Sequence, residues 1–125
     1  MLLGDHQTSI DFNRRALRLS PLDPRIFFAH NGLAFANFFL GNYEDALKCA
    51  VEGLRHHPDY LNGLRAAIAC HSKLGNVDAS KEFLQKLFLL SPNERVSEAR
   101  KRVRYRRDQD MARLEEAYRA AGMPE

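Results

Sequence analysis

Residues 40–47 read Leu-Gly-Asn-Tyr-Glu-Asp-Ala-Leu, and this stretch decides the fold because its pattern recurs along the chain. Gly41 and Gly75 are 34 positions apart, and Pro58 and Pro92 are separated by the same 34 positions. A fixed period between about 20 and 50 residues indicates stacked copies of one supersecondary unit. The unit here is opened by a glycine and closed by a proline.

Each part of the unit has a physical role in a pair of helices. Gly41 follows an apolar run and can adopt the left-handed conformation that ends a helix. Asn42 is then expected to cap the next helix, and Ala46 is small enough for two helices to cross closely. Pro58 ends the second helix. The pattern therefore predicts helix, tight turn, helix, tight turn.

The repeat divides the chain into four parts. The interval from Gly41 to Pro58 is 17 positions, and Gly4 to Pro21 has the same length. We expect a partial repeat, two complete repeats and a two-helix C-terminal cap, over residues 1–21, 22–58, 59–92 and 93–125. The expected helices cover about 5–20, 24–40, 42–56, 59–74, 76–90, 93–104 and 108–121. No stretch alternates with period two, so we expect no strand.

Two aspartates are expected to cap helices in this scheme. Asp23 precedes Pro24, which we expect as the first residue of its helix, and Asp108 precedes the last apolar stripe. A chain that begins inside a repeat lacks the helix that would cover one side of its first complete unit. We therefore expect either that Met1 is an engineered or misassigned start, or that a partner chain provides that cover.

Composition indicates one soluble domain. The chain has 125 residues and a formal net charge of +3, which is too weak to argue for a nucleic-acid partner. Its two cysteines, Cys49 and Cys70, fit a reducing compartment better than a disulfide framework. The longest apolar run, residues 26–40, is too short to cross a bilayer, and no signal peptide precedes it. We expect a cytoplasmic protein without a membrane segment.

The stretch 40–47, followed by Ala50, Gly53-Leu54 and Pro58, resembles a tetratricopeptide repeat. The resemblance implies an all-α, right-handed superhelix that acts as a protein-interaction scaffold. The chain departs from the usual pattern at three positions, which are His30, Leu64 and Ile68.

A narrower resemblance rests on residues 16–24, 38–41 and 121–125. Together these segments are similar to the C-terminal tetratricopeptide region of bacterial multidomain signalling proteins. Such proteins often carry a nucleotide cyclase domain or a winged-helix domain upstream. The resemblance does not identify an upstream domain for this chain.

The helix expected over 24–40 is apolar nearly all round, which favours burial on several sides. One interpretation is that its side chains are simply core. In the other, the resemblance implies that first helices line a concave groove for a peptide or partner helix. The predicted groove residues are Phe28, Asn31, Phe35, Phe38, Asn62, Arg65, Ala69 and Ser72. A homodimer through the same helix is an alternative, because large exposed apolar patches are uncommon on monomers.

The resemblance does not extend to a known class of tetratricopeptide ligand. Many such domains hold a C-terminal carboxylate in a clamp of Lys, Asn and Arg. Gly32, Asn62 and Ala66 occupy the corresponding positions here. A chaperone-tail ligand is therefore not expected.

A basic run covers residues 95–107, where seven of the 19 basic residues lie within 13 positions. Arg100, Arg104 and Arg107 are candidate anion-binding residues on it. In the alternative interpretation the run is a solvated face of a capping helix, neutralised by the acidic residues that follow.

The sequence offers no arrangement of residues for catalysis. We expect the adjacent side chains of His56 and His57 to diverge, and Cys49 and Cys70 lie on different predicted helices. The glycines do not form a phosphate-binding loop. We therefore expect no metal, no cofactor and no enzymatic activity.

Overall fold

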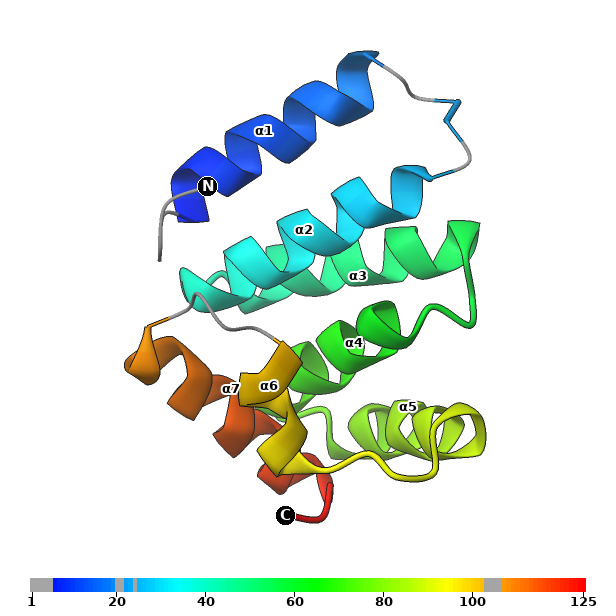
Figure 1. Ribbon diagram of the computed structural model, residues 1–125, viewed down its shortest axis with the longest axis vertical. Coiled ribbons are helices and arrows are strands. Elements are labelled where there is room, and N and C mark those ends of the chain that lie inside the picture. Colours follow the sequence, from blue (N-terminus) through cyan, green and yellow to red (C-terminus); the bar gives the residue numbers. More distant parts are fainter. Residues whose placement is uncertain (1–5, 20–21, 24, 103–106) are drawn as a thin grey trace.

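A computed structural model describes residues 6–19, 22–23, 25–102 and 107–125, and these residues form helices and no strand (Figure 1). The prediction of an all-α chain is confirmed for this part. The elements are α1 (His6–Leu19), α2 (Ile26–Phe39), α3 (Tyr43–His56), α4 (Leu61–Lys73), α5 (Val77–Leu90), the 3₁₀ helix η1 (Val96–Glu98), α6 (Ala99–Arg102) and α7 (Asp108–Ala121). Pro24 and Arg104 lie outside the described residues.

The glycine turns have the predicted left-handed geometry. Gly41 has φ 86° and Gly75 has φ 79°. The Gly41 N–H donates to Phe38 O at 3.0 Å, and the Asn42 N–H donates to Asn37 O at 2.8 Å. This pair of bonds is the Schellman motif, which satisfies carbonyls left free at the end of a helix. Glycine therefore ends α2 and α4 for the physical reason given by the sequence pattern.

The asparagines after these turns do not cap as predicted. Asn42 stands at the N-cap position of α3, but its side chain makes no capping hydrogen bond. Its Nδ2 instead reaches back to Asn37 Oδ1 at 3.5 Å. Asn76 likewise turns back, with Nδ2 3.1 Å from His71 Nδ1. Both side chains join the turn to the preceding helix rather than to the following one.

The two predicted aspartate caps have different outcomes. Asp23 Oδ1 accepts a hydrogen bond from the Arg25 N–H at 2.8 Å, one residue before α2 begins at Ile26. Asp108 is the first residue of α7 rather than its cap, and its Oδ1 accepts from Arg100 Nη1 at 2.8 Å. Asp23 therefore accepts a backbone N–H as a cap would, whereas Asp108 pairs with the side chain of Arg100.

The helices pack in the order of the chain. α2 packs against α3 and α4 packs against α5, so two helical hairpins follow one another, with α1 against α2 and α7 against α4 (Figure 1). Ala46 and Ser80 occupy equivalent places in the two hairpins, and both are buried. Ser80 Oγ also donates to Ile68 O at 3.2 Å across the α4–α5 contact. Small residues at these two positions allow the close helix approach that was predicted.

The first helical segment of the C-terminal cap begins later than expected, at Val96. In place of one helix over 93–104, the described part has η1 and then only four residues of α6. The Val96 N–H donates to Pro124 O at 2.8 Å, so this segment is joined to the C-terminal end of the chain.

Among the described residues, no helix is both long enough and apolar enough to span a membrane.

Gly41 provides a test of the turn geometry. No neighbouring atom lies within 4 Å of the place that a Cβ at Gly41 would occupy, so only the backbone resists substitution. We expect Gly41→Ala to lower the free energy of unfolding by about 1 kcal/mol, since an L-residue is disfavoured at this φ. Gly41→Asn should cost less, because Asn tolerates the left-handed region. Urea unfolding followed by circular dichroism measures both, and an Ala variant as stable as wild type would contradict the explanation.

Candidate functional site

The predicted groove over α2 and α4 is not open. Phe38 is 1% exposed, and Ala69 is also buried, so both belong to the core. In addition, α7 and α6 lie on this side of α4, and Leu114 and Tyr118 of α7 are buried there (Figure 1). The apolar stripe of α7 needs burial, and it takes the surface that was expected to receive a peptide.

A small pocket is what remains of the groove. Its volume is about 210 Å³, and it is lined by Asn31, Gly32, Phe35, Phe39, Asn62, Arg65, Ala99, Arg102, Leu114 and Tyr118. Four of the predicted groove residues, Asn31, Phe35, Asn62 and Arg65, are brought together here, whereas Ser72 is not in the lining. Sites for drug-sized ligands usually have about 300–1,000 Å³. This pocket is too small for a peptide segment.

Arg65 is held by its own chain. Its Nε donates to Glu94 Oε1 at 3.0 Å, its Nη2 contacts the same oxygen, and its Nη1 donates to Asn62 Oδ1 at 2.6 Å. Arg102 Nη2 lies 3.4 Å from the other oxygen of Glu94. Both Arg65 and Glu94 are buried. Arg65 therefore neutralises a buried carboxylate, and the predicted role of orienting a ligand does not fit its contacts.

Phe28 faces a different part of the surface. It lines a cleft of about 570 Å³ between α1 and α2, which we call the α1–α2 cleft. Phe28 is 54% exposed, and across the cleft Phe12 and Leu19 of α1 are 71% and 72% exposed. Large side chains are thus exposed together on adjacent walls, which is unusual for a surface without a partner.

The apolar wall on α1 was missed, although the sequence contains its signal. Phe12, Ala16 and Leu19 are spaced i, i+4 and i+7, so they lie on one face of a helix, and all three line the α1–α2 cleft. The remaining lining residues are Asn13, Asp23, Arg25, Ile26 and Ala29. Asp23 and Arg25 form an ion pair at 3.2 Å, which gives the cleft a charged edge.

Three residues of the basic run, Arg100, Lys101 and Arg102, have acidic partners within the chain. Arg100 donates to Asp108 at 2.8 Å and to Glu115 at 3.2 Å, and these hydrogen bonds raise its pKa. Lys101 pairs with Glu98 at 3.2 Å. Arg107 is exposed, and Arg104 lies outside the described residues. For Arg100, the contacts match the interpretation of a neutralised, solvated helix face.

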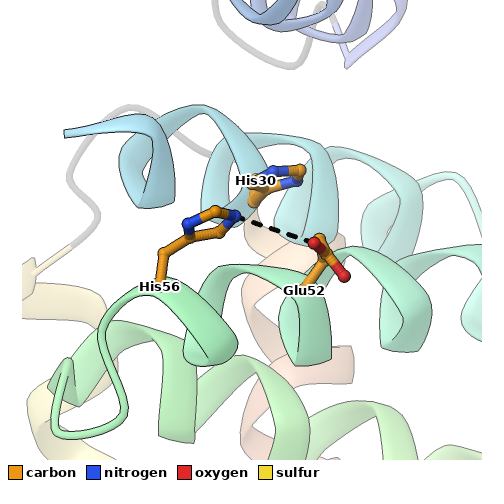
Figure 2. Close-up of side chains that lie close together, drawn as sticks. All are labelled: His30, Glu52 and His56. Atoms are coloured by element: carbon orange, nitrogen blue, oxygen red, sulfur yellow. Dashed lines mark ion pairs between the residues drawn. The ribbon is translucent and has the colours of Figure 1, made fainter. Parts of the chain in front are cut away.

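A cluster of His30, Glu52 and His56 was not expected (Figure 2). One ligand atom from each residue lies within 4.8 Å of the others, and His56 Nε2 is 3.7 Å from Glu52 Oε1. The expectation that His56 and His57 diverge is confirmed, since His56 stacks on His30 and His57 packs against Phe27. That expectation did not consider a histidine from the neighbouring helix.

The cluster has an identifiable cause in the sequence. Glu52 and His56 are four residues apart on α3 and therefore share a face. Between them, Gly53 lies against α2, where an added Cβ would be 3.2 Å from His30 Cβ. The glycine lets the two helices approach closely at His30. Burial lowers the pKa of His30, opposed by the charge of Glu52, so its neutral form with a free ring nitrogen is favoured.

The two cysteines do not contribute to this cluster. Burial raises the pKa of the Cys70 thiol to about 12 and also raises the pKa of the Cys49 thiol. Both are free, and both stay protonated at neutral pH, which makes them poor nucleophiles.

Comparison with models of known protein families and with curated protein sequences found no match.

The Arg65–Glu94 pair provides a stability test. Glu94→Ala leaves the Arg65 charge buried without its carboxylate, and we expect a loss of about 3–5 kcal/mol in the free energy of unfolding. The matched control is Glu98→Ala. Glu98 pairs with Lys101 and is more exposed than Glu94, so its loss should lower the free energy of unfolding by less than about 1 kcal/mol. Denaturant unfolding measures both variants. Equal losses for the two would show that the buried pair contributes no more than a surface pair.

Proposed function

We propose that this chain is a non-catalytic protein-interaction module that binds a helix of a partner protein in the α1–α2 cleft. The observation that supports this most is the exposure of Phe12, Leu19 and Phe28 around one concave surface. Complete burial of a fully exposed side chain of this size contributes about 1.5–3 kcal/mol. Each of the three side chains would contribute the part of this value that corresponds to its exposed fraction. These three side chains are the apolar anchors of the proposed interface.

The repeat architecture supports the same class of function. The hairpins α2–α3 and α4–α5 begin 35 residues apart at Ile26 and Leu61, and in both the first helix ends at a left-handed glycine. This agrees with tetratricopeptide-like units, and we propose that they form the right-handed superhelix of that family. Such arrays act by presenting a rigid surface to other proteins. By the narrower resemblance, the parent would be a bacterial, cytoplasmic signalling protein.

A helix fits the shape and chemistry of the cleft better than an extended segment. Two helices form its walls, and Phe12, Ala16 and Leu19 make a stripe along α1 that matches i, i+4, i+7 anchors on a third helix. The described cleft has no sheet edge to which an extended peptide could add main-chain hydrogen bonds. The Asp23–Arg25 pair at the edge would favour a partner with polar residues flanking its apolar stripe.

Self-association is the second candidate, and the same exposed stripe supports it. Two copies could cover each other's Phe12 and Leu19. The predicted dimer through the helix over 24–40 would then involve α1 as well, because most of the aromatic side chains of α2 are not exposed and Phe28 is the exception.

The binding test starts from a displayed library of amphipathic peptides, from which binders of the full chain are selected. Fluorescence anisotropy then measures the affinity of a selected peptide for each variant. We expect Phe28→Asp and Phe12→Asp each to weaken a selected amphipathic peptide at least tenfold, because each places a charge among apolar anchors. The matched control is Leu89→Asp, which changes an exposed leucine on α5 and should leave the affinity unchanged. If the control weakens the peptide as much as the cleft variants, the proposed interface is wrong.

Light scattering across a concentration series separates the two candidates. A partner-binding module is expected to be a monomer on its own. A wild-type dimer that Phe12→Asp dissociates, with Leu89→Asp still dimeric, would replace the partner helix with a second copy of this chain. Circular dichroism of each variant shows whether it remains folded.

A further inference from the structure

We propose that His30, Glu52 and His56 form a binding site for a divalent transition-metal ion, with Zn²⁺ as the best match to their chemistry. This site is independent of the proposed partner interface. Its residues come from α2 and α3, and their side chains converge at the contact between these helices (Figure 2).

The distances are within reach of coordination. In a tetrahedral zinc site with metal–ligand bonds of about 2.0–2.2 Å, neighbouring ligand atoms are about 3.3–3.6 Å apart. His56 Nε2 and Glu52 Oε1 are already 3.7 Å apart, and the whole set lies within 4.8 Å. Small side-chain rotations would therefore complete the geometry without moving the helices. The His30 and His56 rings are nearly parallel, with centroids 5.6 Å apart, and because an imidazole binds a metal in its own plane, at least one ring would rotate on binding.

The donor set selects a class of metal. Two imidazoles and one carboxylate are the ligands of many zinc and non-haem iron sites, and they leave at least one position for water. Ca²⁺ and Mg²⁺ prefer oxygen ligands and are disfavoured by two nitrogens. Cu²⁺ and Ni²⁺ also bind imidazole, so affinity alone does not distinguish the ion.

The surroundings of Glu52 support a ligand role for one of its oxygens. Arg55 Nη1 donates to Glu52 Oε2 at 3.1 Å, which orients the carboxylate and leaves Oε1 directed toward His56. Hydrogen bonds of this kind to a ligating carboxylate are common around metal sites. His56 is the last residue of α3, where the negative end of the helix dipole favours a cation. The Glu52 and His56 side chains are 41% and 43% exposed, so an ion has access from solvent.

A bound ion would connect α2 to α3. One ligand comes from α2 and two come from α3, so the ion would stabilise the folded hairpin by preferential binding. His30 lies two residues from Phe28 on α2, and the same helix forms one wall of the α1–α2 cleft.

Isothermal titration calorimetry of the full chain with ZnCl₂, in a buffer that does not coordinate metals, tests the proposal. We expect one saturable site in wild type, and at least a tenfold loss of affinity in each of His30→Ala, Glu52→Gln and His56→Ala. Glu52→Gln keeps the size of the side chain and is the variant least expected to disturb packing. A Zn²⁺-dependent rise in melting temperature that is absent from the same variants gives a second readout.

Two histidine controls make the result decisive. His57→Ala removes the neighbour of His56 that packs against Phe27, and His71→Ala removes a histidine stacked on Phe83 of α5. Both should retain the wild-type affinity if they remain folded by circular dichroism. The proposal is overturned if wild type shows no saturable binding, if the three ligand variants bind as tightly as wild type, or if a folded control loses affinity to the same extent.

Discussion

The burial of α4 is the constraint on which the rest of the structure depends. All eight residues from Gly63 to Cys70 are buried, so this helix has no extended polar face along its centre. A helix of this kind must be covered on every side, and α3, α5 and α7 provide the cover. The cost is that Arg65, within this segment, is buried as well. Glu94 neutralises it from the loop after α5, and the position of that loop is thereby tied to α4.

Covering α4 moves the exposed apolar surface elsewhere in the molecule. α7 contributes Leu114 and Tyr118 to the side of α4 that a concave groove would have used, and a pocket of about 210 Å³ remains. Within the part of the chain that the structure describes, no helix covers the α1–α2 cleft in the same way, and its large side chains are exposed. The interaction surface that we propose thus follows from which apolar stripes the described helices cover and which they leave exposed.

Features that depend on residues close together in the sequence could be predicted from the sequence. The glycine turns and the helix ranges are local, because φ at Gly41 and Gly75 and apolar periodicity determine them. The asparagine caps were wrong because Asn42 has a second local partner, Asn37, in the turn it closes. The prediction of an open groove was wrong because the apolar periodicity of α7 predicts that one of its faces is buried, but not which helix that face covers. The cluster of His30 with Glu52 and His56 depends on a crossing between two helices, which no spacing within one helix reveals.

The composition of α2 now has a physical explanation. Its sequence is apolar nearly all round because the helix has neighbours on several sides: Leu33 packs with Ile10 of α1, Gly53 of α3 approaches His30, and Phe35 lies beside α4 and α7. Two of its polar residues lie at these boundaries: His30 at the α3 contact and Asn31 in the pocket shared with α4 and α7. A metal ion there would act on the same helix that carries Phe28 into the α1–α2 cleft, since ligand and anchor are two residues apart on a rigid element. Partner binding and metal binding would then be coupled only if the ion changes the position of α2, because the two sites share no side chain.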